Sequence, residues 1–189
     1  MEAANLGARL ASTDDAGGSD DAAGARLVEA LRLLAAAPHF RPSIDAWVEA
    51  AQAVIATFPQ ASASLGIPTW HYGHEPPNLF ATAIAKYLRN AIREAILLEL
   101  CDGGIVFLPG AAGTVQEVFQ DACENYYADG AAVAPMVLVG HRHWTETVPA
   151  WPLLRSLARG RAMAGAIHLV DDVAEAAAVI ADQPAADIS

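Results

Sequence analysis

Residues 104–114 read GIVFLPGAAGT, and this stretch decides the fold. An unbroken apolar run, Ile105 to Leu108, is typical of a parallel strand that is covered on both faces. A tight loop with two glycines follows at once. Thr114 then opens a helical pattern that points Val115 and Val118 inward. We therefore predict strand, loop and helix in direct succession.

The chain after this stretch repeats the same alternation. Residues 134–139 (APMVLV) and 166–170 (AIHLV) are two further apolar runs of strand length. A helical pattern surrounds residues 151–157, and Asp171 and Asp172 precede a closing helix. Strands that alternate with helices build a parallel sheet with right-handed crossovers. The predicted fold class is α/β with a mainly parallel sheet.

The chain before this stretch is predicted to be mostly helical. Helices are expected over residues 1–10 and 25–37, and a third begins after the cap Ser43. The Gly/Ser-rich acidic segment 11–24 between the first two is predicted to be a mobile loop. An extended segment at 65–72 precedes a long helix from the cap Asn78 to Leu100. We expect all 189 residues to form one domain.

Composition excludes several classes of protein. The formal net charge of -11 argues against a nucleic-acid binder, which needs a basic surface to displace counterions. No apolar run is long and uncharged enough to span a bilayer, and the first residues do not resemble a signal peptide. Cys101 and Cys123 lack metal-ligand spacing, so we interpret them as reduced thiols of a cytoplasmic protein.

The loop after the first strand is the candidate binding site. In a parallel sheet, ligands bind beyond the carboxyl ends of the strands. Glycines let the backbone approach a ligand, and the first turn of a helix offers free amides and a positive dipole end to an anion. Glu117, one turn further on, is close enough to reach a sugar beside a bound phosphate. The predicted phosphate-binding residues are Pro109, Gly110, Ala111, Ala112, Gly113 and Thr114.

Residue spacing alone leaves a second interpretation of this loop open. Thr114 and Glu117 also fit a helix capping box, in which Thr114 is the cap and Glu117 completes it. On spacing the two interpretations are about even.

Other polar residues are interpreted as structural or peripheral. Lys86 is the only lysine and lies in a predicted helix, so a pyridoxal-phosphate enzyme is not indicated. His71 and His74 are interpreted as part of a loop that lines the ligand pocket, and no metal site is expected there. His141 and His143 follow the strand 134–139 and could flank the pocket, although surface histidines are commoner. Asp121 and Glu124 are interpreted as a solvated acidic face.

Residues 108–117, LPGAAGTVQE, resemble the PGGxGTxxE signature of the LONELY GUY (LOG) family of Rossmann-fold nucleotide-binding proteins. Residues 72–80 (YGHEPPNLF) and 119–127 (FQDACENYY) are also similar to a bacterial branch of this family. Residues 1–8 resemble the helix that follows the family's first glycine-rich loop. The resemblance implies a Rossmann-like three-layer sandwich whose N-terminal strands and first Gly-rich loop are missing from this chain.

The resemblance also implies an activity. Enzymes of this family hydrolyse the N-glycosidic bond of nucleoside 5′-monophosphates such as AMP, giving the base and ribose 5-phosphate. The motif glutamate is Glu117. The site arginine is Arg93, with Arg89 as its competitor. No metal and no organic cofactor are implied. A homodimer is implied, with the site near an interface of two helices, residues 80–100 and 114–127.

Two departures from the family pattern carry expectations of their own. Ala111 stands where the family has glycine, which would strain a backbone that required positive φ. A half-sheet without its first strands would expose an apolar edge, so self-association and low activity are expected. The alternatives are a nucleotide-sensing protein without turnover and an inactive truncated fragment.

Overall fold

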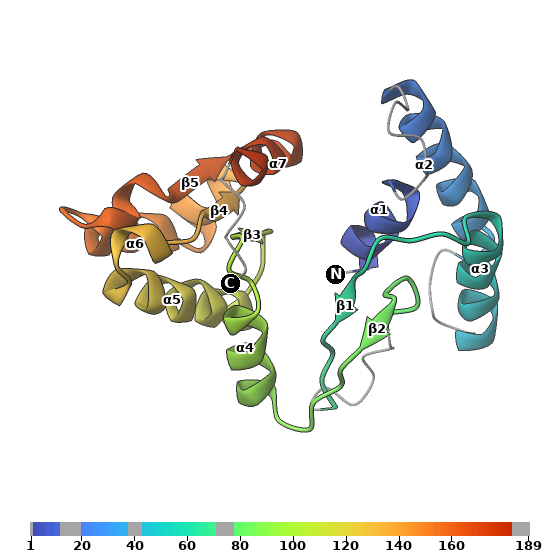
Figure 1. The fold of residues 1–189 in the computed structure, drawn as a ribbon, viewed down its shortest axis with the longest axis horizontal. Helices are drawn as coiled ribbons and strands as arrows, with labels where there is room; N and C mark the ends of the chain where they lie inside the picture. Colours follow the sequence, from blue (N-terminus) through green and yellow to red (C-terminus); the bar gives the residue numbers. More distant parts are fainter. Residues whose placement is uncertain (1, 12–19, 38–42, 71–77, 183–189) are drawn as a thin grey trace. The chain divides into compact units, whose positions relative to one another are not determined.

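The computed structural model describes residues 2–11, 20–37, 43–70 and 78–182. The chain divides into two compact units, Met1–Arg93 and Glu94–Ser189. We describe each unit by itself (Figure 1).

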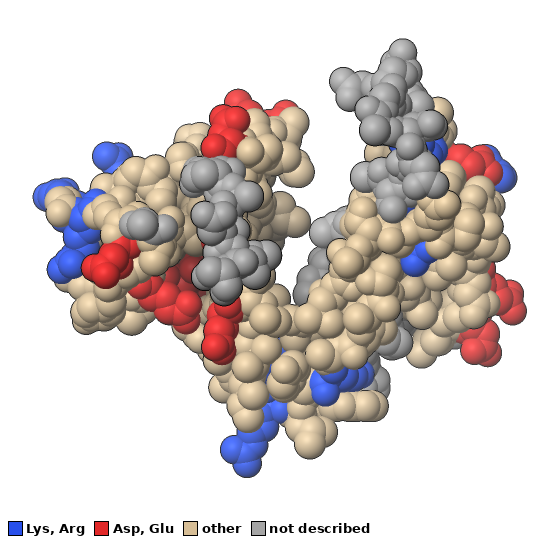
Figure 2. Space-filling model, viewed as in Figure 1, with Lys and Arg blue, Asp and Glu red and all other residues tan. Residues whose placement is uncertain are grey.

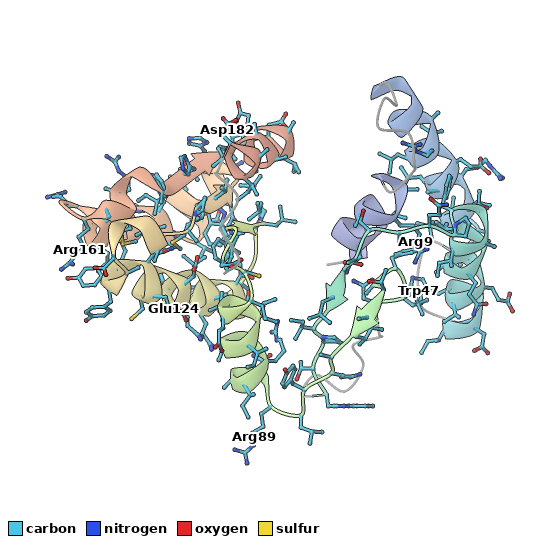
Figure 3. All side chains as sticks on the ribbon, viewed as in Figure 1. Arg9, Trp47, Arg89, Glu124, Arg161 and Asp182 are labelled. Carbon is cyan, nitrogen blue, oxygen red and sulfur yellow. The ribbon has the colours of Figure 1, made fainter. Side chains whose placement is uncertain are left out.

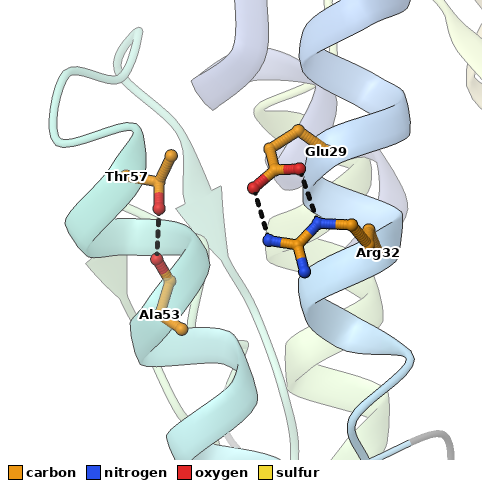
Figure 4. Close-up of polar contacts among 4 residues, drawn as sticks. All are labelled: Glu29, Arg32, Ala53 and Thr57. Atoms are coloured by element: carbon orange, nitrogen blue, oxygen red, sulfur yellow. Dashed lines mark hydrogen bonds and ion pairs between the residues drawn. The ribbon is translucent and has the colours of Figure 1, made fainter.

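The first unit is built on three helices: α1 (Glu2–Ala11), α2 (Asp20–Leu34) and α3 (Ile44–Thr57). The Ser43 side chain accepts a hydrogen bond from the Ala46 amide at 3.3 Å, which confirms the predicted cap. Figure 4 shows two further contacts, the Glu29–Arg32 pair of α2 and the Thr57 hydroxyl bonded to the Ala53 carbonyl. The buried core of this unit consists of Leu6, Leu10, Ala30, Ala51, Val54 and Phe80.

The boundaries predicted for α2 and for the segment before it are wrong. The loop was expected to extend to residue 24, but α2 begins at Asp20. Residues 12–19 of that loop lie outside the described part of the chain. Leu27 and Leu31 of α2 are exposed, and Ala30 is the buried residue among those of α2 whose burial is described. A small alanine allows the close packing of neighbouring helices that leucine would prevent.

The long helix predicted from Asn78 to Leu100 is not formed. Only its second half is helical, as α4 (Asn90–Glu99). The first half contains β2 (Ala83–Ile84), which runs parallel to β1 (Leu65–Gly66), and a bridge joins Thr69 to Tyr87.

Backbone hydrogen bonds explain why this first half is extended. The Asn78 side chain accepts from the Phe80 amide at 3.2 Å and so forms a turn instead of a helix cap. The Ala85 and Tyr87 amides donate to the carbonyls of Gly66 and Pro68, which commits the backbone to the neighbouring extended segment. Lys86 therefore does not lie on a helix, and its ammonium group lies 3.8 Å from the Trp70 ring centre.

The second unit contains the sheet that the sequence predicts. Its three strands are β3 (Ile105–Phe107), β4 (Met136–Val139) and β5 (Ile167–Val170), all parallel and in the order β3-β4-β5. The register pairs Phe107 with Leu138 and Leu138 with Leu169. All four residues of β4 are buried. The α/β fold class with parallel strands is confirmed.

Helices cover both faces of β4. On one face, Val118 and Ala122 of α5 (Ala112–Tyr127) and Leu154 of α6 (Ala150–Ala158) pack with Met136 and Leu138. On the other face, Ala176 of α7 (Val173–Ala181) packs with Val137 and Val139. Three short helical turns complete the unit: η1 (Gly130–Ala132), the π-helical η2 (His143–Thr147) and η3 (Ala162–Gly165).

Only β4 is covered on both faces along its whole length. Val106 of β3 is 38% exposed and the following Leu108 is 53% exposed, so the prediction of a fully covered strand is wrong for β3. Val106 is paired with Val137, whose face α7 covers, but the core around α7 includes no residue of β3. The apolar run correctly predicted a strand at this place. It did not predict whether both faces of the strand are covered, because that depends on where the helices dock.

None of the helices in the described ranges is both long enough and apolar enough to cross a membrane.

One buried side chain braces the entry to β4. The Asn125 amide group donates to the Ala134 carbonyl at 3.1 Å, and its oxygen accepts from the Ala134 amide at 2.9 Å. Asn125 is 5% exposed, so water does not replace these bonds. Both backbone polar groups of Ala134 are thus satisfied by one side chain.

We expect Asn125→Ala to lower the free energy of unfolding by about 2 kcal/mol, because it leaves a buried peptide donor and acceptor unsatisfied. Urea denaturation followed by circular dichroism and tryptophan fluorescence measures this change. The exposed Cys123→Ala on the same helix is the control, with an expected change of about 0.5 kcal/mol or less. Equal stability of the two variants would contradict the bracing role of Asn125.

Candidate functional site

The loop between β3 and α5 is the centre of the candidate site. It leaves the carboxyl end of β3, and Ala111, Ala112 and Gly113 are all exposed. Helix α5 begins at Ala112, with Ala111 as its N-cap residue. The methyl side chain of Ala111 cannot accept a hydrogen bond, and the first-turn amides of a helix have no acceptor within the helix itself. The loop therefore presents amide donors to the solvent.

The structure corrects two expectations about this loop. Thr114 is the third residue of α5 and does not open it, so the capping-box interpretation with Thr114 as the cap is wrong. Ala111 has φ of -115°, which is not a left-handed conformation. Alanine is accommodated there without backbone strain, so the departure from the family glycine carries no conformational cost.

Gly110 is the position in the loop that needs a glycine. A Cβ atom added there would lie 2.1 Å from the Thr114 hydroxyl oxygen and 2.6 Å from the Thr114 Cβ. The Thr114 Cβ belongs to helix α5 and cannot move aside as the end of a long side chain could. A side chain at position 110 would therefore collide with Thr114.

His143, the first residue of η2 after β4, contacts the same glycine. Its Nε2 atom lies 3.0 Å from the Gly110 carbonyl oxygen and 3.3 Å from the Gly110 amide nitrogen. A ring nitrogen that carries a proton donates to the carbonyl, and one without a proton accepts from the amide, so one contact forms at a time. From the sequence, His143 could either flank the pocket or lie on the surface. The structure places it against the loop.

The carboxyl ends of β4 and β5 are joined in a similar way. The Asp171 carboxylate accepts from the His141 amide at 2.7 Å and lies 3.1 Å from His141 Nδ1. Polar residues that follow all three strands thus gather at one edge of the sheet, where ligands of parallel sheets bind.

Glu117 lies half-buried on α5, one turn after Thr114. Its neighbour Gln116 donates through its side-chain amide to Glu94, a carboxylate on α4 that is completely buried. Sequence reasoning did not select Glu94, because a glutamate inside a helical pattern gives no sign of its burial. The last residues of the loop, from Ala112 onward, and Glu117 both belong to α5.

Arg93 and Arg89 differ in burial. Arg93 is 9% exposed, and its guanidinium donates to the Asn90 side-chain oxygen through Nη2 at 2.8 Å and Nε at 3.2 Å. Arg89 is exposed, and Figure 3 shows it extending away from the start of α4. Arg93 belongs to the first unit.

Asp121 is not part of a solvated face, which corrects the sequence interpretation. It is 7% exposed on α5, whereas Glu124 is exposed and labelled on the same helix in Figure 3. Burial, and to a lesser extent the charge of Glu124, raise the pKa of Asp121 from 3.8 to about 7. Burial, followed by the charges of Asp121 and Asp102, also raises the pKa of the Cys101 thiol.

Metal ligation finds no support in the described ranges. They contain no group of three or more His, Cys, Asp or Glu side chains arranged to hold an ion. His71 and His74, which sequence reasoning assigned to the pocket lining, lie outside the described residues.

Comparison with protein-family models and with curated proteins found no match to this chain. A function for the site is therefore argued from the loop geometry together with the sequence resemblance.

The raised pKa of Asp121 predicts how stability depends on pH. Between about pH 4 and pH 7 the unfolded chain has ionised this group while the folded chain keeps its proton. The free energy of unfolding should therefore fall as pH rises through this window, by about 1.4 kcal/mol for each unit of pKa difference. Above pH 7 the contribution is constant.

Urea denaturation of the wild type and of Asp121→Asn across this pH range measures the effect. The variant should lack this slope and should be the more stable protein at pH 8. Glu175→Gln, the same change of charge at an exposed position of α7, should keep the wild-type slope. Parallel curves for the wild type and Asp121→Asn would refute the prediction.

Proposed function

We propose that this chain is a nucleotide-binding protein with a Rossmann-like three-layer fold that hydrolyses the N-glycosidic bond of nucleoside 5′-monophosphates. The observation that carries the proposal is the exposed start of α5, which follows a parallel strand and has no side-chain cap on its N-cap residue Ala111. The LOG-like motif from Pro109 to Glu117 occupies this position.

The phosphate is held by the backbone of the loop. The amides of Ala112, Gly113 and Thr114 belong to the first turn of α5, where the helix dipole places about half a positive charge. The Thr114 hydroxyl, close to the Gly110 backbone, adds a donor at the same place. A phosphate satisfies these donors without any lysine, consistent with a chain whose only lysine is Lys86.

Glu117 stabilises the reacting sugar. Departure of the base breaks the bond from C1′ to the base nitrogen, and the electron pair leaves with the base. The ribose then carries positive charge, which a carboxylate one helical turn from the phosphate stabilises. Water attacks C1′, Glu117 orients it and accepts its proton, and the base gains a proton. The resemblance assigns to Arg93 the role of holding a phosphate or sugar oxygen.

The resemblance extends the proposal to a homodimer in the cytoplasm, with α4 and α5 as the helices closest to the interface. No metal ion and no organic cofactor take part in the proposed hydrolysis.

Activity is tested by incubating the full chain with AMP and measuring ribose 5-phosphate and free adenine in equal amounts. Glu117→Gln should reduce the rate by about 10²- to 10³-fold, because it removes the charge that faces the developing cation. Glu124→Gln, seven residues further along α5, is the matched control and should retain the rate. Nucleotide binding without base release would favour a sensing protein, and neither binding nor cooperative unfolding would favour an inactive fragment.

Phosphate binding is tested separately by a charge placed in the cradle. Gly113→Asp introduces a carboxylate at an exposed first-turn position where an added Cβ meets no atom within 4 Å. Acidic residues stabilise the first turn of a helix, so the fold should be kept while AMP is repelled. We expect at least a tenfold loss of AMP affinity in isothermal titration calorimetry.

Gly103→Asp is the matched control, since it makes the same substitution at an exposed glycine with equal free space before β3. Its AMP affinity should stay within twofold of the wild type. Equal affinities of both variants would show that the start of α5 does not hold the phosphate.

A further inference from the structure

A pocket lies in the Glu94–Ser189 unit, and no residue of the proposed phosphate-binding loop 109–114 lines it. It has a volume of about 480 Å³ and is formed by the end of α6, the turn after it and the start of β5. Ala164 precedes β5 and Ile167 is the first residue of that strand, so the pocket lies at the amino end of β5. The proposed phosphate-binding loop, residues 109–114, follows the carboxyl end of β3. The two sites are therefore at opposite edges of a parallel sheet.

Positive charge is concentrated at this pocket. Residues 94–189 contain four arginines and no lysine, and three of the four are Arg155, Arg159 and Arg161. Arg155 and Arg159 line the pocket. Figure 2 shows blue atoms gathered over this end of the unit, where Figure 3 labels Arg161. In a chain of net charge -11, this is a local reversal of sign.

The two lining arginines are free to bind a ligand. Within the described residues, neither guanidinium has a hydrogen bond or an ion pair. Arg155 lies in the last turn of α6 and Arg159 is the C-cap residue that follows the helix, so two like charges lie near the same helix end and repel. An anion between them would remove this repulsion.

Arg161, which is close in sequence to the two lining arginines, is held by Tyr126 of the same chain. Its guanidinium stacks 3.4 Å from the centre of the Tyr126 ring and donates to the Tyr126 hydroxyl and carbonyl. Arg161 does not line the pocket. Among the described residues, the two arginines that line the pocket differ from Arg161 in having no side-chain partner of this kind.

Attraction to the helix dipole explains only part of this arrangement. Basic residues near a helix C-terminus are stabilising, which accounts for Arg155 in the last turn of α6. It does not account for the hollow beside it. Gly160 has φ of +74° and lines the pocket without a side chain, which leaves the space between the arginines open.

We infer that this pocket binds a small dianion, a phosphate monoester or a dicarboxylate, through the paired guanidinium groups of Arg155 and Arg159. A planar guanidinium group can form two parallel hydrogen bonds to the paired oxygens of a phosphate or of a carboxylate. The volume fits a small metabolite. Ser156 also lines the pocket, but its hydroxyl donates to the Pro152 carbonyl at 2.9 Å, so it contributes no donor to the ligand.

Isothermal titration calorimetry with the full chain tests the inference, with inorganic phosphate and succinate as probes at fixed ionic strength. The Gly113→Asp chain is used, so that the proposed phosphate-binding loop does not contribute to phosphate binding. We expect this chain to bind at least one probe at one site. Arg155→Gln with Arg159→Gln should weaken that binding at least tenfold, and circular dichroism should show an unchanged fold.

Two controls separate a built site from general charge attraction. Arg142→Gln removes an exposed arginine elsewhere in the same unit and should change affinity by less than twofold. Replacing both lining arginines by lysine keeps the charge but loses the bidentate geometry, so affinity should be intermediate.

Tighter binding of phosphate would identify the ligand as a phosphate monoester, and tighter binding of succinate would identify it as a dicarboxylate. The inference is overturned if neither probe binds at millimolar concentration, if the double glutamine variant binds like its parent, or if Arg142→Gln loses as much affinity. Its failure is distinct from failure of the proposed hydrolysis, which is measured as AMP cleavage in chains with Gly113 and both arginines intact.

Discussion

The parallel hydrogen bonding of β4 to both neighbours is the constraint on which the second unit depends. All four residues of β4 are buried, and its register with β3 and β5 aligns the carboxyl ends of the three strands. The alignment brings His143 to Gly110 and Asp171 to His141. Residues separated by some thirty positions in sequence meet at one edge because three strands run in the same direction.

Buried polar groups around α5 are compensated in different ways. Asn125 satisfies both backbone polar groups of Ala134, and Gln116 donates to the buried carboxylate of Glu94. Asp121 is stabilised in its protonated form by the low polarity around it. The contacts of Asn125 and Gln116 add polar interactions to the packing of α5, and the start of α5 is the proposed phosphate cradle.

The two edges of the sheet offer different chemistry to an anion. At the carboxyl edge, backbone amides and a helix dipole form the proposed cradle, and Glu117 is the acid nearby. At the amino edge of β5, side-chain guanidinium groups surround a pocket. The first arrangement depends on backbone geometry and is compatible with a strongly acidic chain, whereas the second depends on two particular arginines.

Local pattern determined the elements of the second unit, from the apolar runs of β3, β4 and β5 to the cap Asp172 of α7 and the glycine-rich loop. These features depend on neighbours within a few residues. The segment from Asn78 to Tyr87 was misjudged as a helix, because its extended form depends on hydrogen bonds to residues 64–68, more than ten positions away. Tertiary structure alone decided the contact of His143 with Gly110, the burial of Asp121 and Glu94, and the exposure of Val106. Burial and long-range contacts are set by how whole elements pack, and a side chain carries no local mark of which face of its element will be covered.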